Sequence, residues 1–236
     1  SSVQKKGVSL VVATAAALTF MTAPVVNAEN ISDATFDSKT TSTSGGALTL
    51  ATDNANKISG STFKKNTAAL KGGAVVIQKN TVITKSTFEA NSQTSTAKDT
   101  AGGAVFIEGA EVEISSGSSF KQNTGFLGGA INVRGGSRLS IKDSVFSGNT
   151  ANGFGGAISD YEDKVGAVKN ELISISGTRF ENNRDSKGGG ALHLVNTKAI
   201  DITDSEFSSN FSAGKGGAIQ LENGSQLAVT NTVFNG

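Results

Sequence analysis

The densest group of side chains that could do acid–base or metal chemistry is Asp160, Glu162 and Asp163. Paired carboxylates can act as general acid and general base, and carboxylate oxygens also bind divalent cations. Tyr161, the only tyrosine, lies among them, and His193 is the only histidine. Because charged residues in loops are mostly solvated, the sequence favours a solvated insertion here and leaves a metal-binding or ligand-binding loop as the alternative.

The composition excludes several kinds of site. The 236 residues include no Cys and no Trp, so disulfides, cysteine-based zinc sites and thiol enzymes are ruled out. A formal net charge of +1 gives no sign of a nucleic-acid partner. Three basic residues lie near one another in the sequence, and we expect them to be ordinary surface charges: Arg134, Arg138 and Lys142. Since the other acidic residues are scattered, we expect no catalytic residue, no metal ion and no cofactor.

A repeat of about 27 residues governs the rest of the chain. The tripeptide Gly-Gly-Ala recurs seven times, at spacings of 26 to 34 residues, starting at Gly45, Gly72, Gly102, Gly128, Gly155, Gly189 and Gly216. In phase with it, Phe-x-x-Asn recurs six times. Its phenylalanines are Phe63, Phe88, Phe120, Phe146, Phe180 and Phe207, and its asparagines are Asn66, Asn91, Asn123, Asn149, Asn183 and Asn210. Phe36 and Phe234 have the same phase in incomplete end copies. A fixed period of this length is typical of solenoids.

Each copy reads as short strands separated by turns. Ile131 and Val133 follow Gly-Gly-Ala, and Leu139 and Ile141 precede Phe146, so apolar residues alternate as they do on strands with one buried face. Three residues before most of the phenylalanines stands a turn former, at Asp33, Gly60, Asp143, Gly177, Asp204 and Asn231.

A unit of about 27 residues of strand and turn cannot bury a face alone, so successive copies must stack. We therefore predict an all-β fold, a right-handed parallel β-helix of about seven to eight turns. The phenylalanines are expected to stack inside it, and the asparagines to form an amide ladder at an inside corner. The Gly-Gly pairs are expected where the chain turns tightly and adjacent turns approach closely.

One column of residues is expected to point outward from the strand that follows Gly-Gly-Ala in each copy. It contains Thr49, Val76, Phe106, Asn132, Ser159, His193 and Gln220. His193 is then an ordinary surface residue. Val76 and Phe106, on adjacent turns, would form an exposed apolar contact face. The alternative is that the Ser/Thr-rich insertion Ser92–Thr100 covers them.

Residues 1–28 have the features of a secretory signal peptide. Lys5–Lys6 forms a basic start, Gly7–Met21 is small, apolar and uncharged, and Val26–Ala28 offers suitable cleavage residues. The apolar run is shorter than the roughly 20 residues that span a bilayer. We expect export, with a β-helical domain over 29–236 that is a fragment of a longer protein. A retained membrane anchor or a buried core helix is the alternative for the first segment.

Gly-Gly-Ala followed by Ile, Val or Leu, in phase with Phe-x-x-Asn, resembles the repeat of the polymorphic membrane proteins of chlamydiae and related bacterial surface proteins. The resemblance covers the chain from Phe36 onward. It implies a passenger domain at the bacterial surface, often part of an autotransporter, with adhesion to host cells as the usual role. The chain departs from the family by lacking cysteine. It also carries Lys39 where the first Asn is expected, so that copy is expected to be a cap.

These features favour a non-enzymatic secreted or cell-surface protein, an adhesin or autotransporter passenger that contacts a receptor or glycan on host or neighbouring cells. Membrane contact is expected only through a segment outside this sequence or during export. The alternative is a structural module that stacks end to end into filaments, because open β-helix ends are unpaired edges. A polysaccharide-cleaving enzyme is the least favoured reading.

Overall fold

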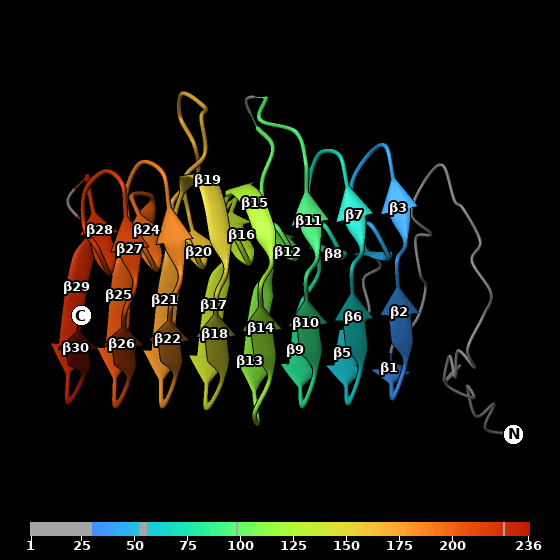
Figure 1. Cartoon of the computed structure of the whole chain (residues 1–236), viewed down its shortest axis with the longest axis horizontal. Helices are drawn as coiled ribbons and strands as arrows, with labels where there is room; N and C mark the ends of the chain where they lie inside the picture. The colour runs from blue at the N-terminus through green and yellow to red at the C-terminus, as the bar shows by residue number, and fades with distance from the viewer. Residues whose placement is uncertain (1–29, 52–55, 98, 224) are drawn as a thin grey trace, which may run out of the picture.

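The computed structural model describes residues 30–51, 56–97, 99–223 and 225–236. The predicted signal peptide, residues 1–28, lies outside this part of the chain. Within these described residues thirty strands are defined, and they form four parallel sheets. Each turn of the chain adds one strand to every sheet in the same order, and the turns stack along the long axis of the molecule (Figure 1). The predicted right-handed parallel β-helix is confirmed.

The strands are grouped by sheet, in the order in which neighbours are hydrogen-bonded. The first sheet contains β1 (Asn30–Ser32), β5 (Asn56–Ser59), β9 (Thr81–Thr84), β13 (Glu111–Ser115), β17 (Arg138–Lys142), β21 (Asn170–Ser176), β25 (Thr197–Thr203) and β29 (Gln226–Thr230). The second contains β2 (Thr35–Asp37), β6 (Thr62–Lys64), β10 (Thr87–Glu89), β14 (Ser119–Lys121), β18 (Val145–Ser147), β22 (Arg179–Glu181), β26 (Glu206–Ser208) and β30 (Val233–Asn235). The third contains β3 (Thr40–Thr41), β7 (Thr67–Ala68), β11 (Ser92–Gln93), β15 (Thr124–Leu127), β19 (Thr150–Phe154), β23 (Arg184–Asp185) and β27 (Phe211–Ser212). The fourth contains β4 (Leu48–Leu50), β8 (Val75–Ile77), β12 (Val105–Glu108), β16 (Ile131–Arg134), β20 (Ile158–Ser159), β24 (Leu192–Leu194) and β28 (Ile219–Leu221).

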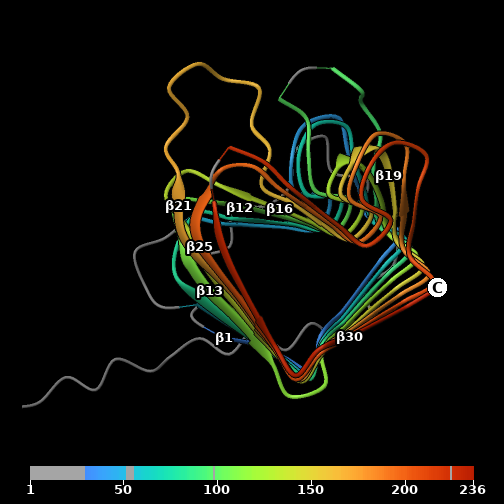
Figure 2. The same ribbon diagram turned by 90° about the vertical axis from the view of Figure 1, so that its left-hand side faces the viewer.

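Only three of the four sheets enclose the main core. Viewed along the axis, the first, second and fourth sheets form the sides of a triangle, and the third sheet lies outside it, beside one end of the fourth (Figure 2). The chain therefore leaves the triangle after each second-sheet strand, forms a short third-sheet strand and returns through Gly-Gly-Ala. This excursion decides what covers the outer face of the fourth sheet.

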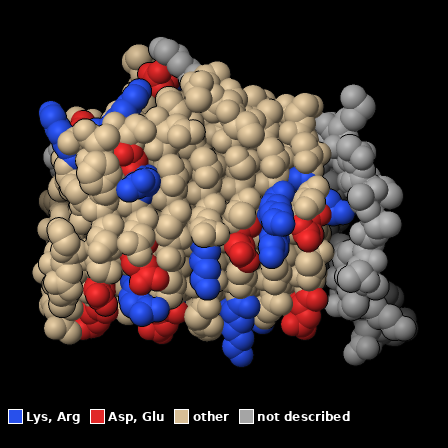
Figure 3. All heavy atoms as spheres, in the orientation of Figure 1, with Lys and Arg blue, Asp and Glu red and all other residues tan. Residues whose placement is uncertain are grey.

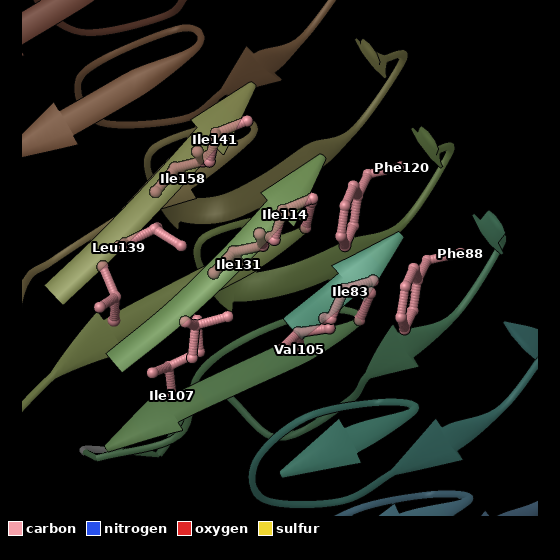
Figure 4. Packing of buried hydrophobic residues seen from close by; sticks show 14 of the residues in the cluster. Ile83, Phe88, Val105, Ile107, Ile114, Phe120, Ile131, Leu139, Ile141 and Ile158 are labelled. Atoms are coloured by element: carbon pink, nitrogen blue, oxygen red, sulfur yellow. The ribbon is translucent and has the colours of Figure 1, made fainter. Parts of the chain in front are cut away.

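The phenylalanine column lies inside the triangle. From Phe36 to Phe234 each ring stacks on the next, with centroids 4.7 to 5.0 Å apart and nearly parallel planes. The parallel register requires this, because it pairs each Phe with the Phe of the next turn. Figure 4 shows Phe88 and Phe120 on neighbouring turns, with Ile83, Ile114 and Ile141 of the first sheet repeating beside them. Identical side chains at the strand spacing thus fill the core.

The asparagine column forms a hydrogen-bonded ladder at the corner that follows the second sheet. Asn149 shows the pattern: its Nδ2 donates to the Phe120 carbonyl at 3.0 Å and to Asn183 Oδ1 at 2.9 Å, while its Oδ1 accepts from the backbone N and Nδ2 of Asn123, both at 3.0 Å. At the first turn, where Lys39 replaces Asn, the Lys39 backbone N donates to Asn66 Oδ1. The ladder satisfies backbone groups that would otherwise be buried without partners.

A second ladder, which the sequence reasoning missed, lies at the corner between the first and second sheets. A hydroxyl residue stands two positions before each phenylalanine except the first, at Ser61, Ser86, Ser118, Ser144, Thr178, Ser205 and Thr232. Each hydroxyl donates to a backbone carbonyl two or three residues earlier, at 2.7 to 3.0 Å. All of them except Ser144 also accept a backbone N–H from the preceding turn, as Ser86 Oγ does from Ser61 at 3.1 Å. The recurrence of Ser or Thr two positions before Phe is the sequence signal from which this ladder could have been predicted.

The Gly-Gly pairs have two separate requirements. Gly128 has a φ of 71°, in the left-handed region that favours glycine. Gly129 has an ordinary φ, but a Cβ on it would overlap the carbonyl oxygen of Gly156 in the next turn. The first glycine therefore allows the turn, and the second allows adjacent turns to stack at the strand spacing.

Candidate contact site

The outer face of the fourth sheet carries a second apolar cluster rather than an open surface. It contains Val76, Ala101, Phe106 and Leu127, with Phe126, Phe154 and Tyr161 packed against it and partly buried. Val76 is 4% exposed and Phe106 is 1% exposed. The expectation that these two form an exposed contact face is therefore wrong.

The physical reason is the chain excursion through the third sheet. Strand alternation does direct Val76 and Phe106 out of the triangle, but the third-sheet strands and the segments that follow them fold over that face. The insertion that ends at Thr100 contributes, since Thr100 is buried and Ala101 belongs to the apolar cluster. The alternative of a covering loop therefore accounts for Val76 and Phe106.

Arg134 is also buried, so its assignment as an ordinary surface charge is wrong. Its guanidinium lies 4.5 Å from the centre of the Phe106 ring, and its Nη1 lies 2.6 Å from Asp99 Oδ1. Lys71 Nζ lies 3.0 Å from Asp99 Oδ2 and 4.9 Å from the same ring. Partial burial works to raise the pKa of the Asp99 carboxyl, but Lys71 and Arg134 outweigh this and hold the pKa below its usual value. Arg134 thus fastens the insertion to the fourth sheet.

His193 is 1% exposed and is not a surface residue. Its ring stacks on Phe154 with centroids 4.4 Å apart, and its Nε2 lies 3.4 Å from Glu222 Oε1. Burial lowers the pKa of the imidazole, and the negative charges of Glu222 and Asp185 only partly oppose this. His193 is therefore a packed, neutral side chain in the same outer layer as Phe106.

The acidic insertion divides into a buried and a more open part. Asp160 is fully buried, and its carboxylate accepts hydrogen bonds from the backbone N of Val195 at 2.6 Å, the backbone N of Asn196 at 2.9 Å and the hydroxyl of Thr197 at 2.7 Å. The expectation of a solvated insertion is wrong for Asp160 and holds for Asp163, which is exposed. Asp160 fixes the start of the insertion to the next turn, a structural role.

The described residues contain no group of three or more His, Asp or Glu side chains arranged to hold a metal ion. Asp160, Glu162 and Asp163 do not converge on one point, since Asp160 is engaged by the next turn. In the same part of the chain, no helical segment is long and apolar enough to span a bilayer. Acidic and basic side chains are interspersed on the face that Figure 3 shows, without a large area of one sign.

The outer layer is incomplete over the first three turns, where a hollow of about 430 Å³ remains. Its floor is formed by Thr49 and Val76 of the fourth sheet, and Leu70 lies on the side of the third sheet. Gln78 and Glu108 line the opposite side. This hollow combines concavity with hydroxyl, amide, ammonium and carboxylate groups, so it is the candidate site.

The stacked turns, in which every strand pairing of the described residues is parallel, define a β-helical solenoid. A family model described as the right handed beta helix region matches residues 50–234, and the chain belongs to this family. A similar curated protein is the probable autotransporter YfaL of Escherichia coli (strain K12), with 36% identity over 107 residues. The alignment covers 40% of this chain and 8% of that protein. No solved structure matches the chain.

Proposed function

We propose that the chain is a non-enzymatic, secreted or cell-surface passenger that contacts host or neighbouring cells, as adhesins do. The observation that carries the proposal is the similarity to a probable autotransporter. The β-helical fold agrees with it, because stacked turns present flat faces and loops along a rod. The phase of Gly-Gly-Ala with Phe-x-x-Asn further supports a passenger of the polymorphic membrane protein type. A rod of this kind can hold a contact site away from a membrane without an enzymatic cleft.

The test is binding of the purified full chain to epithelial cells and to bacterial cells, with its mass measured by light scattering. Saturable binding by a monomer is expected. Unsaturable binding, or no binding to either cell type, contradicts the proposal. Release of reducing sugar from a panel of polysaccharides would instead point to an enzyme.

A second candidate is end-to-end stacking into filaments. The last turn exposes Leu227, Val229 and Phe234 by 36 to 47%, whereas Ile200, Ile202 and Phe207, their partners in the preceding turn, are buried. A further turn would cover these side chains, whether it came from the same polypeptide or from a second copy. Growth of the light-scattering mass with concentration, and rods in electron micrographs, would favour this candidate over the first.

A further inference from the structure

The hollow over the first three turns has the size and position of a ligand site. Its volume of about 430 Å³ lies within the roughly 300–1,000 Å³ typical of small-ligand pockets. It lies on the outer face of β4, β8 and β12, where Thr49, Val76 and Phe106 are aligned by the parallel register. Thr49, Val76, Phe106 and Glu108 lie on these strands, and the other lining residues come from the segments between strands.

The lining offers hydrogen bonds but no unpaired positive charge. Lys71 and Arg134 are both engaged by the Asp99 carboxylate, at 3.0 and 2.6 Å. The side chains of Asp99 and Glu108 nevertheless remain 57% and 40% exposed, and a carboxylate oxygen that is already paired can accept a further hydrogen bond from a donor in the hollow. The hydroxyl of Thr49 and the amide of Gln78 add further donors and acceptors. An anionic ligand would meet two carboxylates without a free cation.

An apolar patch accompanies these polar groups. Leu70 is 41% exposed on one side of the hollow, and Val76 forms part of the floor. The Phe106 ring is not accessible, because Lys71 and Arg134 lie over it. The hollow therefore suits a neutral ligand that has many hydroxyl groups and a small apolar face, without requiring an aromatic platform.

A peptide bound as an added strand does not fit this place. β8 pairs with β4 on one side over Val75, Val76 and Ile77, and with β12 on the other side over the same residues. No backbone donor or acceptor of β8 is free to pair with an incoming strand, as strand addition requires. Recognition in the hollow must therefore use side chains.

From this chemistry we propose that the hollow binds a short neutral glycan, whose hydroxyls donate to Asp99 and Glu108 and exchange hydrogen bonds with Gln78 and Thr49. The inference rests on the proposed contact function and deepens it, since it names both the class of partner and the site. A carboxylate accepts well from the paired hydroxyls of a sugar ring, and the apolar ring face packs against Leu70, which is 41% exposed.

The test uses the full chain and a printed array of di- to tetrasaccharides built from glucose, galactose, mannose and N-acetylglucosamine, with sialylated and sulfated glycans beside them. Binding of at least one neutral glycan is expected, and the affinity is then measured by titration calorimetry. Binding of acidic glycans only overturns the proposal, as does the absence of any binding to the neutral ones.

Two variants in the hollow and one control variant outside it test where the ligand binds. Gln78→Ala removes an exposed amide from the hollow, and Gln226→Ala makes the same change at an exposed position of β29. Thr49→Leu adds bulk to the floor at a column position that accepts Phe106 and His193 in other turns, so the fold tolerates it. We expect about tenfold weaker glycan binding for Gln78→Ala and Thr49→Leu, and unchanged binding for Gln226→Ala.

The same variants separate the two proposals. If Thr49→Leu keeps its melting temperature, its cell binding and its affinity for neutral glycans, the contact lies elsewhere. That result overturns this inference, while the proposed contact function stands. Cell binding by the wild-type chain without neutral-glycan binding has the same meaning. Loss of both cell and glycan binding in the folded Thr49→Leu variant supports the hollow, and a wild-type chain that binds neither probe overturns both proposals.

Discussion

The guanidinium of Arg134 lies 4.5 Å from the centre of the Phe106 ring, and neither side chain reaches solvent. A long cationic residue is thus part of an apolar layer outside the triangular core, compensated by the Asp99 carboxylate. This pairing joins a loop to the solenoid and makes the outer layer a second core rather than a surface. Substitutions on the outer face of the fourth sheet should therefore act on stability first.

Phe106→Asp should lower the free energy of unfolding by about 3 kcal/mol or more, because it removes a buried ring and buries a carboxylate. Val82→Asp is the matched control, since Val82 is 39% exposed on a first-sheet strand, and its effect should stay within about 0.5 kcal/mol. Urea denaturation measures both. A Phe106→Asp variant as stable as the wild type would show that the outer layer is open in solution.

Phe146→Ala should destabilise the chain by about 3–5 kcal/mol. The ring is fully buried and stacks on Phe120 at 4.7 Å and on Phe180 at 4.9 Å, so its loss leaves a cavity that the rigid strands cannot close. Ser147→Ala, on the outward side of the same strand, is expected to be nearly neutral. Equal melting temperatures for the two variants would be incompatible with a stacked interior column.

Asn149→Ala should cost roughly 1–3 kcal/mol, because it leaves buried donors of Asn123 and the Phe120 carbonyl without partners. The exposed Asn152, three residues on, provides the control Asn152→Ala. Hydrogen exchange gives a second readout: the Asn123 backbone amide should exchange faster in Asn149→Ala and not in Asn152→Ala. Unchanged protection of that amide would remove the ladder as a source of stability.

The fold could be predicted from the sequence because the same residue pattern recurs from copy to copy. Each copy places Phe, Asn and Gly-Gly at the same phase, and one rule of strand alternation then assigns the inner face in every turn. The same rule directed Val76 and His193 outward, and both side chains do point out of the triangle formed by the first, second and fourth sheets. It could not show that the third-sheet excursion covers that face, because a two-residue strand such as Thr67–Ala68 has no alternation of its own.

The candidate site was not predictable from the repeat either. Arg134 and Asp99 lie in different turns, and Asp99 belongs to an insertion that has no equivalent in the other copies. Their contact depends on how a single insertion folds back. The hydroxyl ladder was different, since Ser86 and its equivalents recur before Phe and carried a readable signal. Features that recur from copy to copy, such as the hydroxyl ladder, could be predicted from the sequence, whereas a contact that occurs once, such as that between Arg134 and Asp99, could not.

Gly129→Ala should be strongly destabilising although Gly129 has an ordinary φ, since the new Cβ would overlap the Gly156 carbonyl oxygen. Gly217→Ala changes the same motif position in the last copy, where the nearest atom to the new Cβ is the Asn210 carbonyl oxygen at 3.7 Å. We expect a lower melting temperature and reduced soluble yield for the first variant and little change for the second. Equal behaviour would mean that adjacent turns are not held at strand spacing there.

Two buried groups should give the stability of the chain opposing pH dependences. Burial raises the pKa of Asp160 to about 6 in the folded chain, and the hydrogen bonds from Thr197, Val195 and Asn196 offset this only in part. A raised pKa means that the contribution of Asp160 is fully present below its unfolded pKa of about 3.8 and is lost as the pH rises through about 6. Burial lowers the pKa of His193 below 6.5, so its contribution is present above 6.5 and is lost as the pH falls through the folded pKa.

The two effects can be separated by measuring the free energy of unfolding in urea between pH 4 and pH 8. Asp160→Asn keeps the shape of the side chain and removes its titration, so the fall in stability between pH 4 and pH 6, on the order of 2 kcal/mol, should disappear. His193→Gln, which introduces the residue that the next turn carries at Gln220, should remove the rise toward neutral pH. A wild-type profile that neither variant changes would mean that these groups are hydrated in the folded chain, because burial is what raises the pKa of Asp160 and lowers that of His193.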